Sequence, residues 1–109
     1  MTPTEDPRTA LTKLHEDLCN EARELSARKN QDYAAGEDPF ANFRLCADMS
    51  LCSATTGVLV RLSDKMRRLA SLESQEAQVL DESRRDTILD IINYAVILAA
   101  LYSEPIGQE

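Results

Sequence analysis

The sequence predicts an all-α fold: a compact bundle of three long helices and one short helix, which we expect to be oligomeric. The chain has only three glycines and four prolines among 109 residues, too few turn-forming residues for a strand-rich fold. Apolar residues also recur at steps of three and four, the spacing of one helical face. The length predicts a single domain over residues 1–109, with one hydrophobic core.

The first long helix is expected from Asp6 to about Lys29. Asp6 is a favourable N-cap, and Pro7 suits the first helical position because an N–H there would have no helical partner. The apolar residues that follow at helical spacing are Leu11, Leu14, Leu18, Ala22 and Leu25. Their spacing places them on one face, which we expect to pack against the rest of the bundle.

The short helix is expected from Asp38 to about Ala47, with Asp38 as its cap and Pro39 at its first position. Phe40 and Phe43 lie three residues apart and therefore on one side of this helix. Residues 48–56 should then form a loop before the next helix.

The second long helix is expected over residues 57–72, with Thr55 or Thr56 as its cap. Its main apolar face consists of Leu59, Leu62, Met66 and Leu69. Beside that face runs a basic flank made of Arg61, Lys65 and Arg68. Val60 and Asp64 share the far side of the helix, and a helix with apolar groups on two sides is often sandwiched between neighbouring helices.

The third long helix is expected from near Asp81 to near Ser103, before Pro105. Nearly every residue from Ile88 to Tyr102 is apolar, which predicts a central helix buried on all sides. A chain of this size can hardly surround such a helix. We therefore expect part of this surface to be the interface of a homo-oligomer.

Four polar residues form an acidic stripe along this last helix: Glu82, Asp86, Asp90 and Asn93. Their spacing places them on one narrow strip of surface, where neighbouring carboxylates repel. Carboxylates inside an apolar run need a compensating partner, and Mg²⁺ is one that takes carboxylate oxygens and keeps waters for a phosphate. The alternative is structural: the helix dipole favours acids in the first turns, and the basic flank can pair with Asp90.

Several residues around the short helix are candidate ligand-binding residues. Lys29 could meet a phosphate, Asp32 a sugar hydroxyl or a metal, and Tyr33 could stack on a base. Asn42 could read the edge of a base. The alternative for the first three is helix capping and packing, and the alternative for Asn42 is hydrogen bonding to backbone groups of a loop.

Composition excludes several other function classes. The net charge of -7 disfavours broad nucleic-acid binding, although a local basic cluster could still hold one small phosphorylated ligand. Cys19, Cys46 and Cys52 show neither paired nor zinc-binding spacing and suit reduced thiols in the cytoplasm. His15 is the only histidine, so a histidine-based catalytic triad is effectively unavailable. No signal peptide and no membrane span is expected, which predicts a cytoplasmic protein.

Four motifs follow one another along the chain: Lys29-Asn-x-Asp-Tyr33, Pro39-Phe-x-Asn-Phe43, Arg61-x-x-Asp-Lys65-x-x-Arg68 and Glu82-x-x-x-Asp86-x-x-x-Asp90-x-x-Asn-Tyr94. Together they resemble the family called nucleotide modification associated domain 1, which is found largely in phages and bacteria. The resemblance covers about residues 25–100. It implies a link to nucleotide metabolism, and a phage-encoded member would act in the host cytoplasm.

The helical layout also looks like that of the all-α nucleotide pyrophosphohydrolases, the MazG and dimeric dUTPase group. That likeness implies paired acids that hold magnesium against a nucleoside triphosphate. Asp64 and Asp90 match the acidic motifs position by position. Arg61 and Thr87 stand where that group has acids.

These observations predict a magnesium-dependent nucleotide-processing protein, with pyrophosphohydrolysis of a (deoxy)nucleoside triphosphate as the expected reaction. Its catalytic residues would be Asp64, Asp86 and Asp90, and its metal ligands Glu82, Asp86 and Asp90. The expected ligand-binding residues are Lys29, Asp32, Tyr33, Asn42, Arg61, Lys65, Arg68, Asn93 and Tyr94. Two alternatives remain open: a non-catalytic phage-type protein that sequesters a (cyclic) nucleotide signal, and a helical interaction module.

Overall fold

A computed structural model describes residues 5–31, 40–74 and 79–103. These residues form four α-helices and no strand, which confirms the predicted all-α fold. The helices are α1 (Pro7–Gln31), α2 (Ala41–Asp48), α3 (Ala54–Leu72) and α4 (Glu82–Tyr102). The single domain predicted over the whole chain stays a prediction.

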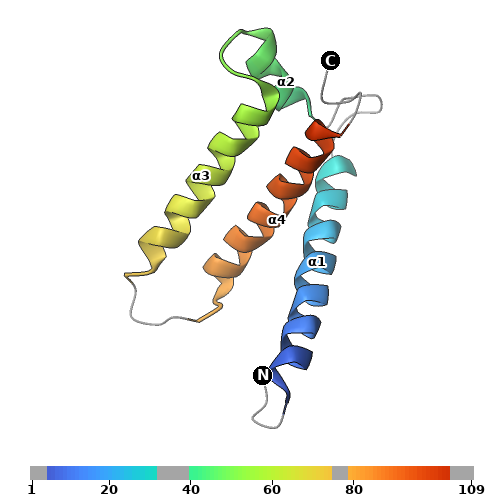
Figure 1. Cartoon of the computed structure of the whole chain (residues 1–109), viewed down its shortest axis with the longest axis vertical. Helices are drawn as coiled ribbons and strands as arrows, with labels where there is room; N and C mark the ends of the chain where they lie inside the picture. The colour runs from blue at the N-terminus through green and yellow to red at the C-terminus, as the bar shows by residue number, and fades with distance from the viewer. Residues whose placement is uncertain (1–4, 32–39, 75–78, 104–109) are drawn as a thin grey trace.

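The last helix, α4, lies between α1 and α3, and the short α2 packs on α3 at one end of the bundle (Figure 1). The chain runs in the same direction along α1 and α4 and in the opposite direction along α3. This arrangement gives α4 contacts on both sides, as expected for the most apolar helix of the four.

The ends of α1 and α4 follow the predicted caps. The backbone N–H of Arg8 donates to Asp6 Oδ1 at 3.0 Å, and the N–H of Arg84 donates to Asp81 Oδ1 at 2.9 Å. Both carboxylates therefore satisfy N–H groups that have no helical partner in a first turn. At its other end α1 extends to Gln31, slightly beyond the predicted end.

The predicted start of α3 is wrong by three residues, because the helix begins at Ala54 and its cap is Ser53. The Ser53 hydroxyl accepts a hydrogen bond from the backbone N–H of Thr56 at 3.1 Å. Thr55 and Thr56 instead lie within the first turn. Ser53, Thr55 and Thr56 all carry a hydroxyl that can cap a helix, and the first of suitable geometry takes the position.

The short helix α2 ends in a tight, left-handed turn. Ser50 has a φ of 58°, and the N–H of Leu51 returns to the carbonyl of Cys46 at 2.9 Å. This is the Schellman arrangement, which satisfies carbonyls in the last turn of a helix. The predicted opening of this helix at Asp38 and Pro39 lies outside the described residues.

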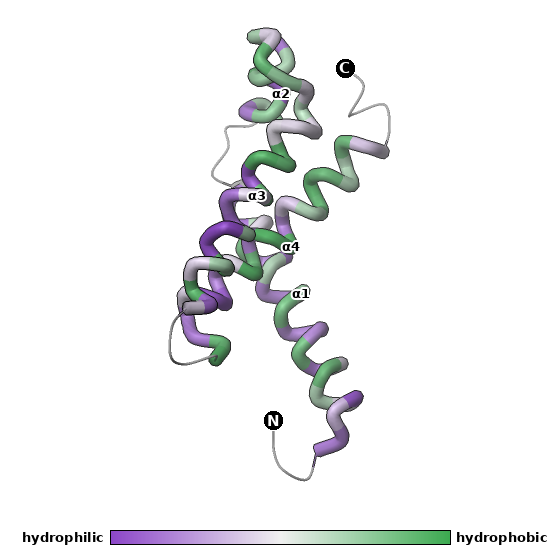
Figure 2. The backbone as a smooth tube through the Cα atoms, turned by 60° about the vertical axis from the view of Figure 1, so that its left-hand side comes forward, coloured by the Kyte–Doolittle hydropathy of each residue, from purple (hydrophilic) through white to green (hydrophobic). Residues whose placement is uncertain are grey.

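Few apolar residues are buried in the described part of the chain: Ala10, Ala22, Val58, Leu89 and Leu101. The prediction that α4 is buried on all sides is therefore only partly right, since Val96 and Tyr102 are 62% and 65% exposed. Figure 2 shows that the C-terminal part of α4 is hydrophobic almost throughout, whereas α1 alternates. The oligomer that the sequence predicts stays a prediction.

No described helix combines the length and the apolarity that crossing a membrane requires.

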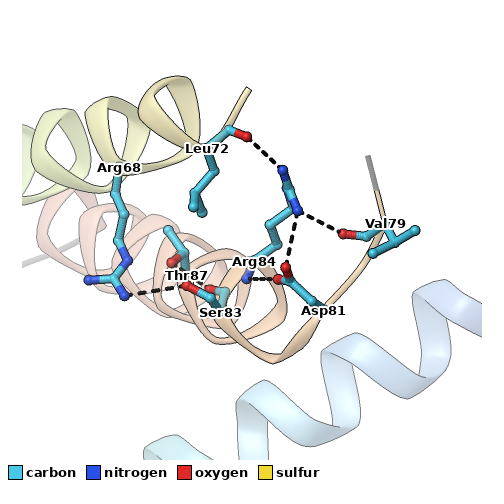
Figure 3. Close-up of polar contacts among 7 residues, drawn as sticks. All are labelled: Arg68, Leu72, Val79, Asp81, Ser83, Arg84 and Thr87. Carbon is cyan, nitrogen blue, oxygen red and sulfur yellow. Dashed lines mark hydrogen bonds and ion pairs between the residues drawn. The ribbon is translucent and has the colours of Figure 1, made fainter. Parts of the chain in front are cut away.

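A buried arginine fixes the connection between α3 and α4 (Figure 3). The guanidinium of Arg84 donates to the Leu72 carbonyl at 2.7 Å, to the Val79 carbonyl at 3.2 Å and to Asp81 Oδ2 at 3.1 Å. The Leu72 carbonyl belongs to the last turn of α3, where helical N–H partners are missing. We call these four residues the Arg84 clasp.

An ion pair joins α1 to α4. Arg85 donates from Nη2 and Nε to Glu21 Oε2, at 2.6 and 2.9 Å. The hydrogen bond from Arg85 holds the pKa of Glu21 below its ordinary value. Neighbouring arginines of α4 therefore serve two different connections, Arg84 toward α3 and Arg85 toward α1.

Candidate functional site

A pocket of about 390 Å³ opens where the four helices come together, within the range typical of small-molecule sites. Its lining residues are Ser26, Lys29, Phe40, Asn42, Phe43, Cys46, Gly57, Arg61, Asp90, Asn93, Tyr94, Val96, Ile97 and Ala100. Because α4 rises about 1.5 Å per residue, Asp90 and Ile97 lie roughly 10 Å apart along its axis. The pocket thus has a charged end near Asp90 and an apolar end near Ile97.

The charged end is built from α1, α3 and α4. Asp90 Oδ2 lies 3.0 Å from Lys65 Nζ, and Asp90 Oδ1 lies 4.0 Å from Lys29 Nζ. Lys65 is outside the pocket lining and neutralises Asp90 from behind. Arg61, one turn before Lys65, lines the pocket and has no ion-pair partner among the described residues. The pocket therefore offers two cations to an anion: Arg61, which has no ion-pair partner in the described part of the chain, and Lys29, whose ammonium is paired with Asp90 only at 4.0 Å.

The apolar end carries aromatic rings. Phe43 and Tyr94 meet edge to face, with centroids 6.3 Å apart and an interplanar angle of 85°. The Phe40 ring lies beneath the Arg44 guanidinium, 5.8 Å from its centroid. Flat aromatic surfaces of this kind suit a planar, weakly polar group.

Close packing of α2 on α3 forms the floor of this end. Gly57 is buried, and a Cβ there would lie 3.6 Å from Cys46 Sγ and 3.7 Å from Phe43 Cδ1, which is ordinary contact distance. Burial and the neighbouring Cys46 raise the pKa of the Cys52 thiol, which keeps that thiol protonated at neutral pH. The Cys52 thiol therefore contributes bulk to this region and no negative charge.

Among the described residues, one amide in the pocket has no hydrogen-bond partner. The Asn93 Nδ2 atom is buried and has no hydrogen-bond partner among the described residues. Asn93 also lines a shallow apolar hollow between α1 and α4, which shares Ser26 and Val96 with the pocket. A buried donor left unpaired costs about 1–3 kcal/mol, so this group is suited to an acceptor supplied by a ligand.

The structure brings five of the predicted ligand-binding residues into this one pocket: Lys29, Asn42, Arg61, Asn93 and Tyr94. Asp90, predicted as a catalytic and metal-binding residue, lines the same pocket. Asp32 and Tyr33 lie outside the described residues. Lys65 supports the site through Asp90, as described above. Arg68 lies away from the pocket, where its Nη2 donates to Ser83 Oγ at 3.4 Å beside the Arg84 clasp (Figure 3).

The acidic stripe does not converge on a metal site. Glu82 and Asp86 are exposed, and Asp64 is exposed on α3 and outside the pocket lining. Within residues 5–31, 40–74 and 79–103, no three His, Cys, Asp or Glu side chains are placed to hold an ion together. Glu82 and Asp86 lie in the first turns of α4, where the helix dipole favours acidic side chains without a metal ion. Asp90 pairs with Lys65 of the basic flank, which was the structural alternative to metal binding.

Sequence reasoning missed most of the apolar lining. Cys46, Gly57 and Ile97 line the pocket but look like ordinary core residues in a helical pattern. Phe40 and Phe43 carried the one available signal, since they flank Asn42 on one side of a short helix. The role of Arg84 in joining two helices had no signal, because its partners include two backbone carbonyls.

Comparison with known proteins identifies the family. Residues 29–101, which hold every described residue of the pocket except Ser26, match the family described as nucleotide modification associated domain 1. No curated protein and no solved structure matches the chain. The likeness to nucleotide pyrophosphohydrolases therefore stays a prediction. The match spans more than half of the chain, and the chain therefore belongs to the nucleotide modification associated domain 1 family.

Proposed function

We propose that this protein binds a nucleotide in the pocket between the four helices, with the phosphate at the charged end and the base at the apolar end. The observation that carries the proposal is the make-up of one pocket, which is lined both by two cations, Lys29 and Arg61, and by aromatic rings. A nucleotide has the same division between an anionic group and a flat heterocycle. The family description, which names nucleotides, points to the same ligand class.

The phosphate would be held by charge-assisted hydrogen bonds. Arg61 carries a planar guanidinium that donates two parallel bonds to phosphate oxygens, and Lys29 adds a mobile ammonium. The two side chains come from different helices, so both reach the phosphate only when α1 and α3 are in place around α4. Binding would therefore also tie the helices together, and it should raise the stability of the folded protein.

The base would lie against the aromatic rings. Stacking on an aromatic side chain is worth about 1–3 kcal/mol per base and tolerates every base. Asn93 supplies a donor for an acceptor atom on the base edge, and Asn42 lies exposed at the pocket, where it can add a second polar contact. The site should reject ligands that lack such an acceptor, because Asn93 Nδ2 would then stay buried and unpaired.

Hydrolysis is not part of this proposal. The pyrophosphohydrolase reaction predicted from the sequence needs several carboxylates around a magnesium ion. The described residues offer Asp90 alone at the pocket, and two lysines already neutralise it. These residues do not fit a magnesium ion held by the protein, so we derive no hydrolytic step.

Calorimetric titration of the full chain tests the proposal. The probes are the four common 2′-deoxynucleoside monophosphates and their triphosphates, with magnesium and with EDTA. We expect Arg61→Ala to weaken the tightest complex by about tenfold or more, the loss of one bidentate phosphate contact. Arg67→Ala is the matched control, because Arg67 is exposed on the same helix and outside the pocket lining.

Each outcome decides between the candidate functions. If no probe gives a heat of binding or raises the melting temperature, the proposal is overturned and the helical interaction module is favoured. If Arg61→Ala and Arg67→Ala lose nucleotide affinity equally, the pocket is not the binding site. Chromatography of the recovered nucleotide separates intact ligand, which binding without turnover requires, from cleaved products, which would restore the pyrophosphohydrolase prediction.

A further inference from the structure

The charge balance at the pocket bears on how many phosphates its ligand carries, provided that the proposed nucleotide binding holds. The pocket lining and the lysine behind it carry three positive charges, on Lys29, Arg61 and Lys65, and one negative charge, on Asp90. The net charge is therefore two positive units. A phosphate monoester, whose second pKa is near 6, carries close to two negative charges at pH 7 and matches this balance.

The acidic stripe lies where a longer polyphosphate would extend. The pocket follows α4 from Asp90 toward its C-terminus, so the phosphate end of a ligand points back along the helix toward Asp86 and Glu82. Residues four apart stack on one helical face, which places these exposed carboxylates in line beyond Asp90. A β- or γ-phosphate entering that strip would meet like charge on Asp86 and Glu82, while the nearby cations Arg68 and Arg85 already donate to Ser83 and Glu21. The described residues also offer no group of acids to hold a magnesium ion that would screen it.

From these two observations we propose that the pocket selects a nucleoside monophosphate, bound without a metal ion, and that Asp86 and Glu82 disfavour di- and triphosphates. The acidic stripe thus contributes to specificity by repelling the longer phosphate chains, a means of discrimination that specific binding sites often use. This gives a function to two carboxylates that bind nothing else in the described part of the chain.

The test is a calorimetric series in EDTA at low ionic strength. Each of the four 2′-deoxynucleosides is titrated as free nucleoside, monophosphate, diphosphate and triphosphate. We expect the monophosphate of the preferred base to bind about tenfold more tightly than its triphosphate, and the nucleoside to bind more weakly than the monophosphate. Added salt should reduce the discrimination, because the carboxylates are exposed.

Two variants separate the stripe from general charge effects. Asp86→Asn should strengthen triphosphate binding by about threefold or more while leaving the monophosphate nearly unchanged. Asp48→Asn removes the same charge from an exposed position on α2, outside the pocket, and should leave the ratio unaltered. Both positions are exposed, so neither change should unfold the protein, and circular dichroism confirms the helix content.

The pH dependence gives an independent readout. Monophosphate affinity should fall as the pH is lowered through about 6, where the ligand loses its second charge. A triphosphate that binds as tightly as the monophosphate in EDTA, or an Asp86→Asn variant with an unchanged ratio, would overturn this inference and leave nucleotide binding standing. A protein that binds none of the probes would instead overturn the proposed function itself.

Discussion

The two halves of α4 differ in how their polar groups are satisfied. In the first half Arg84 donates to three acceptors of the clasp, and Arg85 donates twice to Glu21 of α1. In the second half the buried Asn93 Nδ2 has no partner among the described residues, and Val96 is left exposed. One helix therefore carries a satisfied, structural half and an unsatisfied half that borders the pocket.

This difference shows where stability and ligand binding are separated in a small protein. Fully paired polar groups fix the relative position of helices, whereas unpaired ones weaken the free protein and become useful only with a ligand. Substitutions in the two halves should accordingly have opposite effects on the free protein. The four experiments below test that contrast, from the largest expected effect to the smallest.

Removing the guanidinium of the clasp should have the largest effect. In Arg84→Ala the Leu72 and Val79 carbonyls and Asp81 lose their shared donor. Hydrogen bonds from a charged, buried donor are each worth about 1.5–3 kcal/mol, so we expect a loss of about 3 kcal/mol in the free energy of unfolding. Urea denaturation measures it, with Arg67→Ala as the exposed control; similar values for the two variants would contradict a structural role for the clasp.

A substitution in the pocket half should have the opposite sign. Asn93→Leu replaces an unpaired buried amide by an apolar side chain of similar size, and we expect the free protein to gain about 1 kcal/mol in unfolding free energy. Nucleotide affinity should fall in the same variant. Asn42→Leu is the control for the free energy of unfolding alone, because Asn42 is exposed and offers no buried donor to remove. A destabilised Asn93→Leu protein would show that the amide is satisfied in solution.

A substitution in the turn after α2, beside the pocket, should give a smaller gain in the free energy of unfolding. Ser50 adopts a φ of 58°, a conformation that glycine reaches without the strain of a Cβ. Ser50→Gly should therefore raise the free energy of unfolding by about 0.5–1 kcal/mol. Ser63→Gly, an exposed site within α3, should do the reverse because glycine disfavours a helix interior. Thermal denaturation of both variants gives the two signs.

The half-exposed pair between α1 and α4 should give the smallest effect, visible through its pH dependence. The hydrogen bond from Arg85 lowers the pKa of Glu21 in the folded protein below its ordinary value of 4.5. The pair therefore adds stability above that ordinary pKa and loses it as the pH falls through the lowered, folded-state pKa. The difference in unfolding free energy between wild type and Glu21→Gln should shrink from pH 7 toward pH 3. A difference that stays constant with pH would assign it to packing.

The fold was largely predictable because its signals are local. Asp6 and Asp81 are caps whose role depends on the next few residues alone, and the structure places both as expected. The error at α3 has the same origin, since Ser53 and the two threonines after it offer equivalent local chemistry. Local rules identify the kind of cap and leave its position uncertain by a few residues.

The site was predictable only in part because it depends on how helices pack. Arg61, Lys65 and Arg68 are equivalent on a helical face, yet packing brings Lys65 to Asp90, Arg61 to the pocket and Arg68 to Ser83. The level at which α3 and α4 cross decides among them, and one sequence carries no measure of that level. Likewise, the spacing of Glu82, Asp86 and Asp90 defines a shared strip of surface and leaves open what faces it.

The position of α4 between its neighbours has a consequence for the order of folding during synthesis. The Glu21–Arg85 pair joins residues 64 positions apart, and α1 packs chiefly on α4. At translation rates of about 5–20 residues per second, α1 leaves the ribosome several seconds before its partner helix exists. Through that interval its leucine face, in which Leu11 remains 68% exposed even in the finished protein, has no packing surface. The nascent chain is thus most open to chaperones and to aggregation before α4 emerges, and α2 and α3 can pair meanwhile because they are close in sequence.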